Sequence, residues 1–236
     1  MPAQLIDGVA LSRRLRTDIG ARASALAATG HRPSRLSFRP MPRTIYETPV
    51  IAPLLRATSR TLLRLLRWRV EGTLAPEARR CVVIAAPHTS NWDFPYTLLA
   101  AFALGMHIRW LGKASLFRAP FGGVMRWLGG VAVHRDRANN LVEASVQALK
   151  EAPGALQLVI APEGTRSRSV VWKTGFHHIA RGAAMPIQLA YLDWGQRRCG
   201  LGPLMTAGAD IEADLREIKA YYRGFRGRNA DQFDAQ

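Results

Sequence analysis

The chain has 236 residues, with 33 Lys or Arg against 17 Asp or Glu, so its formal net charge is +16. A hydrophobic fraction of 48% is enough to build a core, which excludes global disorder, and the length favours one globular domain with an attachment. Its two cysteines, Cys81 and Cys199, are far apart and exclude a disulfide scaffold or a cysteine zinc site. The basic charge indicates a partner that carries phosphate, either a nucleic acid or a membrane lipid.

Residues 1–44 are predicted to be a disordered tail, because proline, serine and arginine occur there without a sustained hydrophobic period. The segment has no continuous apolar run of the kind found in a secretory signal. The alternative expectation is that Met41 is the natural start and that the preceding residues are an extension upstream of it.

The segment 45–74 is predicted to be an amphipathic helix at a membrane interface. Between Val50 and Val70, four arginines fall within about 80° of arc, and Ile51 with most of the leucines is placed on the opposite side. The four are Arg56, Arg60, Arg64 and Arg67. Four charges argue against a membrane-spanning helix, whereas a cationic face beside a leucine-rich face suits an anionic lipid surface. An ordinary surface helix packed on its own domain fits the pattern equally well.

Residues 75–228 alternate between strand and helix patterns and are predicted to form the main domain, with a short tail over 229–236. Apolar runs predict strands at 81–86, 107–111, 131–134, 155–161 and 186–192. Helical patterns lie at 91–104, 121–128, 139–151, 172–182 and 210–225. The alternation predicts an α/β fold, a layered sheet with helices on both faces and functional loops at the strand ends.

His88 and Asp93 lie five residues apart in the sequence APHTSNWDF, directly after the first predicted strand. Thr89, Ser90 or Asn91 is expected to cap the next helix, which places Asp93 in its first turn. The carboxylate can then orient the imidazole and leave its other nitrogen free as a general base. No GxSxG motif supplies a nucleophile, so the proton is expected to come from a substrate hydroxyl. Taken alone, this spacing is more often structural.

A second polar cluster, IAPEGTRS, follows the fourth predicted strand. Gly164 allows close approach to the backbone, Thr165 offers a hydroxyl, and Arg166 can bind a phosphate through two parallel hydrogen bonds. Glu163 is expected to hold Arg166 or Arg135 in place, or to accept a hydrogen bond from a substrate hydroxyl. Taken alone, EGTR is better explained as a polar turn at a strand end.

Together, the two motifs resemble those of the lysophosphatidate and glycerophospholipid acyltransferase family. The run from His88 to Asp93 matches that family's H-x-x-x-x-D motif, and Glu163 to Arg166 matches its E-G-T-R block. Gly130 to Arg135 matches an intervening G-V-x-x-x-R block, and Met185 to Ile187 matches a final apolar block with proline. The resemblance covers about residues 45–225.

The chain departs from that family's pattern at two places. Ala161 stands where an aromatic residue often precedes P-E-G-T-R, and Gln188-Leu189 stands where a second proline is common. Both departures leave the acceptor and the acyl-chain specificity open. The segment from Tyr191 to Trp194, followed by Arg197 and Arg198, is similar to small bacterial members of the family.

The resemblance implies a glycerol-3-phosphate acyltransferase-like fold and a bacterial O-acyltransferase of phospholipid biosynthesis. Acyl-CoA or acyl carrier protein would be the co-substrate, with no cofactor and no metal. The acceptor would be a lysophospholipid or a glycerophosphate-type hydroxyl. The protein would be peripheral, at an anionic membrane surface on the cytoplasmic face of a bacterial inner membrane, and would bind no nucleic acid.

The resemblance also assigns roles to residues. His88 would be the general base and Asp93 would orient it. The substrate would be bound by a group of six residues, Lys113, Arg135, Glu163, Gly164, Thr165 and Arg166. Within this group, Arg135, Gly164 and Arg166 would bind the acceptor phosphate. Lys113 would be an additional phosphate contact, and it is equally well explained as a salt-bridged surface residue. Backbone N–H groups near Gly164 are candidates for stabilising the negative charge that develops on the thioester oxygen.

Two other functions remain open on the sequence. One is an acyltransferase for a non-glycerolipid acceptor, such as another lyso-lipid or a glycolipid. The other is a basic nucleic-acid-binding protein, which would explain the charge but not the paired motifs.

Trp110 and Trp127 are core residues or the border of an acyl groove, and Phe117–Gly123 is expected to be a loop near the membrane.

Overall fold

The computed structural model describes residues 43–133 and 138–235. Within them, seven strands form one sheet in the order β1-β7-β6-β2-β5-β3-β4. The strands are β1 Arg69–Glu71, β2 Arg80–Ala86, β3 Ile108–Lys113, β4 Gly130–Val133, β5 Leu156–Ile160, β6 Ile187–Asp193 and β7 Arg198–Met205. The helices are α2 Ile51–Leu65, α3 Asp93–Leu104, α4 Gly122–Trp127, α5 Ala138–Glu151, α6 Gly175–Ala183 and α7 Ile211–Tyr222.

The central strands are parallel, so their carboxyl ends lie along one edge of the sheet. β2 pairs in parallel with β5 and with β6, and β3 pairs in parallel with β5 and with β4. β7 runs antiparallel to β6. The loops after β2, β3 and β5 therefore open at the same edge, which is where α/β proteins bind their ligands.

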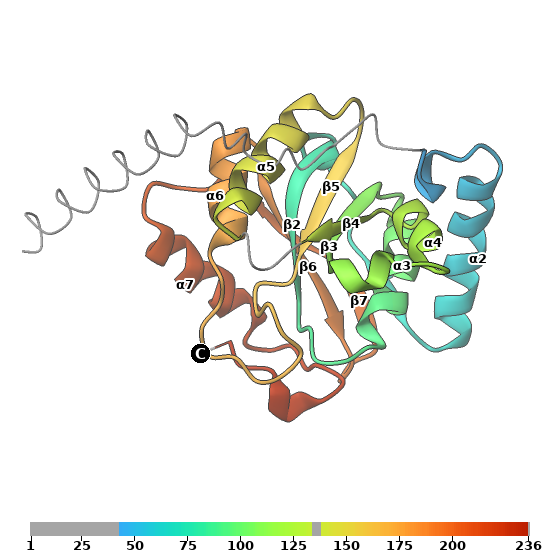
Figure 1. The fold of residues 1–236 in the computed structure, drawn as a ribbon. Coiled ribbons are helices and arrows are strands. Elements are labelled where there is room, and N and C mark those ends of the chain that lie inside the picture. Colours follow the sequence, from blue (N-terminus) through green and yellow to red (C-terminus); the bar gives the residue numbers. More distant parts are fainter. Residues whose placement is uncertain (1–42, 134–137, 236) are drawn as a thin grey trace, which may run out of the picture. The chain divides into compact units, whose positions relative to one another are not determined.

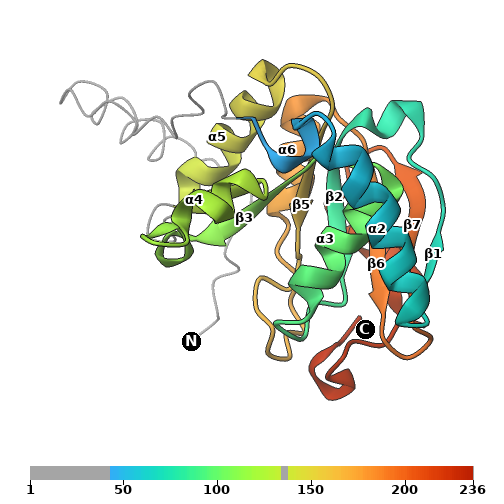
Figure 2. The same ribbon diagram turned by 90° about the vertical axis from the view of Figure 1, so that its right-hand side faces the viewer.

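Helices cover both faces of the sheet, with α5, α6 and α7 on one side and α2 and α3 on the other (Figures 1 and 2). Side chains of β2 alternate between two cores. Val82 and Ile84 pack with Phe176 of α6 and with residues of α5 and α7, whereas Val83 packs with Phe102 of α3. This alternation is the pattern of a strand buried on both faces, and it confirms the predicted layered α/β fold.

The predicted strands and helices are present with shifted ends, but the sequence pattern does not predict β1 or β7. β1 has three residues, too few to show a period. β7 contains Gly200, Gly202 and Pro203, which are residue types that strands disfavour. A Cβ atom at Gly200 would come within 2.3 Å of the Glu71 carbonyl oxygen, so the close approach of β1 requires glycine there.

Within the segment 45–74, which is predicted to be one amphipathic helix, α2 begins at Ile51 and ends at Leu65. Arg67 adopts a φ of 61°, in the left-handed region, and the N–H of Trp68 donates to the carbonyl oxygen of Leu63, which closes the end of the helix. Trp68 is then buried, with 4% of its surface exposed, and the following residues pair with β7. Burial of the large indole therefore decides where the helix ends.

One face of α2 packs on α3, and two of its arginines serve that contact. Ser59 and Leu63 are buried, although Leu63 was expected on the side opposite the arginines. Arg60 Nε donates to the carbonyl oxygen of Ala103 at 3.0 Å, and Arg56 lies against Gly105 at the carboxyl end of α3. A cation at this end of a helix is favoured by the helix dipole.

The leucine-rich face of α2 remains exposed. Leu54 and Leu65 are 60% and 75% exposed, and Leu62 is exposed beside them. The helix thus packs on its own domain through one face and presents a second, apolar face outward. No helix among the described residues is both long and apolar enough to cross a membrane.

Residues 229–235, predicted as a separate tail, pack against the main domain. Asn229 Nδ2 donates to the carbonyl oxygen of Thr89 at 2.9 Å, and its backbone N–H donates to Thr89 Oγ1 at 3.2 Å. Trp172 Nε1 donates to the carbonyl oxygen of Asp234 at 3.2 Å. The domain therefore extends through residue 235, and its last segment contacts the loop that carries His88.

Candidate active site

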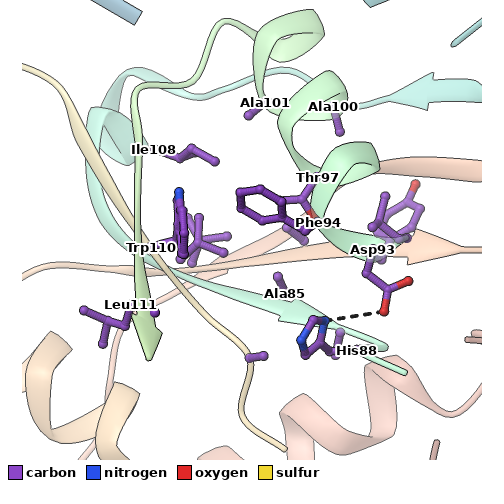
Figure 3. A pocket seen from close by; sticks show the side chains of 18 of the residues that line it. Ala85, His88, Asp93, Phe94, Thr97, Ala100, Ala101, Ile108, Trp110 and Leu111 are labelled. Atoms are coloured by element: carbon purple, nitrogen blue, oxygen red, sulfur yellow. Dashed lines mark ion pairs between the residues drawn. The ribbon is translucent and has the colours of Figure 1, made fainter. Parts of the chain in front are cut away.

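His88 lies on the loop after β2, and Asp93 begins α3. His88 Nδ1 is 3.4 Å from Asp93 Oδ2, and the two side chains face one another at one end of a pocket (Figure 3). Asp93 Oδ2 also accepts the backbone N–H groups of Thr89 at 2.7 Å and Ser90 at 2.8 Å. Because Asp93 is only 2% exposed, these donors compensate the burial of its charge and hold the loop around the carboxylate.

The start of α3 differs from the prediction. The residue before the helix is Trp92, not one of the three expected caps, and it makes no side-chain capping hydrogen bond. Of the three, Ser90 acts nearest to the helix, because its Oγ accepts the N–H of Trp92 at 3.2 Å. The second oxygen of Asp93, Oδ1, accepts the indole N–H of Trp194 at 2.9 Å. The sequence places Trp194 in a distinctive segment but gives it no role.

Glu163 connects its own EGTR motif to the loop that carries His88. Its Oε1 accepts the backbone N–H of His88 at 3.0 Å, and the residue is 3% exposed. Burial raises the pKa of this carboxyl, and hydrogen bonds from its own N–H and that of His88 oppose the shift. Glu163 thus accepts a hydrogen bond from the loop that carries His88, and not from Arg166 as one expectation had it. The other expected partner, Arg135, lies outside the described residues.

A cavity of about 580 Å³ runs between α3 and the sheet, with His88 and Asp93 at one end (Figure 3). It follows α3 as far as Leu104, a length of roughly 16 Å at 1.5 Å per residue. Phe94 and Trp110 form part of its wall, with ring centroids 4.7 Å apart. Small and aliphatic side chains make up most of the rest, including Val83, Ala100, Ala101, Met106, Ile108 and Val159. The cavity suits an extended apolar chain that ends at His88.

Two cationic side chains line the same cavity. Lys113 ends β3, and Arg166 lies in the loop after β5, so both are at the edge of the sheet where His88 follows β2. Both side chains are exposed to solvent. The cavity therefore combines an apolar interior with positive charge and an imidazole at its polar end.

The glycine of EGTR adopts a φ of 65°, which favours glycine over other residues. Lys173 Nζ lies 2.8 Å from the position that a Cβ atom of Gly164 would take, which adds a third cation beside the motif. The Gly164 N–H donates to the carbonyl oxygen of Ala161 and is therefore not free to stabilise an oxyanion. That role for other N–H groups near Gly164 stays a prediction. Thr165 Oγ1 accepts the N–H of Ser167 at 3.2 Å. No sequence motif includes Lys173, whose only signal is its place in the loop after EGTR.

The two cysteines are poor candidates for a nucleophile. Cys81 and Cys199 are free and buried, and burial raises the pKa of both thiols to about 12. Among the described residues, no three His, Cys, Asp or Glu side chains are grouped in a way that could hold a metal ion.

The chain is similar to proteins of known families. Residues 67–191, more than half of the chain, match the family model described as Acyltransferase. A stretch of 112 residues is 32% identical to the 1-acyl-sn-glycerol-3-phosphate acyltransferase of Salmonella typhimurium and covers 44% of each protein. The match thus spans less than half the length of that relative. A stretch of 33 residues is 64% identical to the bifunctional protein FolD of Paraburkholderia phytofirmans and covers 12% of it, too little to show a family.

The fold has a counterpart among solved structures. The crystal structure of the 1-acyl-sn-glycerophosphate (LPA) acyltransferase, PlsC, from Thermotoga maritima aligns with 79% of this chain and 81% of that one. The TM-score is 0.52 at 16% sequence identity, which shows a shared fold. With the family match over residues 67–191, this establishes that the chain belongs to the acyltransferase family.

Proposed function

We propose that the protein is an O-acyltransferase that moves a fatty acyl group from a thioester to a hydroxyl of a lysophospholipid or glycerophosphate-type acceptor. One observation carries the proposal: a single cavity has the His88–Asp93 pair at its polar end, an apolar interior, and the cations Lys113 and Arg166. The donor's acyl chain would occupy the interior, and the acceptor's phosphate would bind the cations. The name of the Salmonella relative supports this acceptor class.

In the proposed reaction, His88 Nε2 takes the proton of the acceptor hydroxyl while the hydroxyl oxygen attacks the thioester carbonyl carbon. Asp93, beside Nδ1, stabilises the imidazolium that forms. Collapse of the tetrahedral intermediate breaks the C–S bond, and the proton passes to the departing sulfur. An ester and a free thiol result without an acyl-enzyme.

The test is an acceptor screen that measures free thiol released from acyl-CoA and, separately, from an acyl carrier protein thioester. We expect release to depend on an acceptor and to be faster with lysophosphatidate than with lysolipids that lack a terminal phosphate. Release that is equal with and without acceptor would indicate a thioesterase and contradict the proposal. Release only with a glycolipid or another non-phosphate acceptor would support the alternative acceptor class instead.

Arg166→Ala tests the phosphate site. We expect the KM for a phosphorylated acceptor to rise about 10-fold or more, and the KM for acyl-CoA to stay within about 2-fold, because a charge-assisted contact to phosphate is lost. Arg168→Ala is the matched control, since Arg168 lies in the same loop but pairs with Asp234 at 3.0 Å. Equal effects of the two substitutions, or a larger effect on the donor, would remove Arg166 from the phosphate site.

We also propose that an anionic membrane surface is the partner of α2 and of the segment from Ala114 to Trp127. This segment exposes Leu116, Phe121, Val124 and Trp127, and Phe121 is 66% exposed. Residues 94–135 contain no Asp or Glu, so the charged side chains of this stretch are all basic, as suits an anionic surface. Because Leu116 also lines the cavity, a lipid substrate would have a short path from the membrane.

Leu54→Ser with Leu65→Ser tests the contribution of α2. We expect the fraction of protein that floats with anionic vesicles to fall to less than about half, because two exposed apolar side chains no longer enter the interface. Val170→Ser with Val171→Ser is the control, because both valines are exposed but lie in the loop between β5 and α6 instead of on α2. Unchanged flotation of the α2 variant, with thermal unfolding like wild type, would remove α2 from the membrane contact.

A further inference from the structure

The carboxylate of Asp93 uses its two oxygens differently. Oδ2 faces His88 Nδ1 and accepts the N–H groups of Thr89 and Ser90, which all lie on the same loop. Oδ1 accepts the indole N–H of Trp194, which lies 101 residues further along the chain, after β6. A hydrogen bond to a buried carboxylate is charge-assisted and is stronger than one between neutral groups.

The turn that carries Trp194 is rigidly built. Trp194 follows β6, and the neighbouring Asp193 is buried and holds the turn. Asp193 Oδ1 accepts the N–H groups of Gly195 at 3.1 Å and Gln196 at 3.3 Å, and Oδ2 is 3.0 Å from Arg198 Nε. The segment YLDW with its following arginines is thus a structural unit that aims one indole at Asp93.

The indole itself is clamped by rings. Trp68 lies edge-on to Trp194 with centroids 5.0 Å apart, and Tyr96 lies 4.7 Å away. The guanidinium carbon of Arg228 lies 4.9 Å from the centroid of the Trp194 ring and 5.3 Å from that of Trp92. Trp194 is not among the described residues that line the cavity, so its effect on bound substrate passes through Asp93.

We infer that Trp194 is a positioning residue for the His88–Asp93 pair. The terminal torsion of an aspartate has a broad energy profile, and the N–H groups of Thr89 and Ser90, which belong to the loop itself, hold only Oδ2. An N–H donor fixed on Oδ1 holds the carboxylate plane and keeps Oδ2 directed at His88. This role rests on the proposed function of His88 as a base, and it gives the YLDW segment a purpose that the sequence does not reveal.

Trp194→Phe tests the inference, because it keeps an aromatic ring and removes the donor. Trp68→Phe is the matched control: it changes an indole of the same ring cluster that has no hydrogen bond to Asp93. In the acyl-CoA assay we expect kcat to fall about 10-fold in Trp194→Phe, with the KM values for donor and acceptor within about 2-fold of wild type. Trp68→Phe is expected to keep a kcat within about 2-fold of wild type.

A second measurement does not depend on turnover. The six tryptophans give indole N–H signals in a proton–nitrogen NMR spectrum, and the signal that disappears in Trp194→Phe identifies Trp194. In Asp93→Ala we expect this signal to move upfield and its proton to exchange faster, while the Trp68 signal, assigned in the same way, keeps its position more closely.

The outcomes separate the two proposals. The role of Trp194 would be overturned if Trp194→Phe kept the kcat of wild type, or if both tryptophan variants lost kcat equally. It would also be overturned if the Trp194 indole signal did not shift in Asp93→Ala. A wild-type protein that releases no thiol with any acceptor would instead contradict the proposed function, and the NMR comparison would still report whether the hydrogen bond exists.

Discussion

Replacing His88 by alanine is expected to lower kcat for acceptor-dependent thiol release by about 10²–10⁴-fold, the range that a positioned general base contributes. The acceptor hydroxyl would lose the only imidazole in the cavity among the described residues. Because the His88 side chain is partly exposed, we expect the temperature of thermal unfolding to change little. The measurement is a thiol assay at saturating donor and acceptor, beside unfolding followed by circular dichroism.

His178→Ala is the matched control for that experiment. His178 is exposed on α6, on the opposite face of the sheet from the cavity, and it should leave kcat unchanged. A His88→Ala variant that folds normally and retains more than about a tenth of wild-type activity would refute the assignment of His88 as the base.

Asp93→Asn is expected to lower kcat about 10²-fold and also to destabilise the domain. The amide keeps the shape of the side chain, but it loses the charge that stabilises the imidazolium. Its NH₂ group would also face N–H donors, since both carboxylate oxygens accept N–H groups in the structure. Leaving buried donors unsatisfied costs about 1–3 kcal/mol in the free energy of unfolding. Kinetic assays and chemical denaturation measure the two effects separately.

The chain offers a matched control in a second histidine–aspartate pair. His177 Nε2 lies 2.8 Å from Asp214 Oδ2 between α6 and α7, and neither residue lines the cavity. Asp214→Asn should therefore lower stability and leave kcat near wild type. If both variants lost activity in proportion to their loss of stability, the effect of Asp93→Asn would be structural and the catalytic role of Asp93 would be contradicted.

Hydrophobic period predicts the order and type of most elements, because it depends on neighbours within one or two turns. The apolar run at 81–86 is the central strand β2, and Asp93 does open a helix. The prediction is less successful where packing decides. The helix after Val50 ends early because Trp68 is buried, and β7 forms although it contains glycine and proline.

The candidate site shows the same division. Both motifs can be found in the sequence, and parallel strands bring His88, Lys113 and Arg166 to one edge of the sheet. The partner of Glu163 was not predictable, because its hydrogen bond to the His88 backbone joins residues 75 positions apart. Lys173 also carries no distinguishing pattern, and the hydrogen bond from its N–H to the carbonyl oxygen of Pro162, which holds it beside Gly164, forms only in the folded chain.

By itself, the sequence determined an alternating α/β domain, a basic chain without a disulfide framework, and a histidine and carboxylate that follow a buried strand. These properties are local, or they add up over residues regardless of how the chain folds. The tertiary structure decided that α2 packs on α3 through one face and exposes its leucines, that the last residues belong to the domain, and that Trp194 reaches Asp93. Such contacts depend on strand order and register, which bring distant residues together only once the whole sheet has formed.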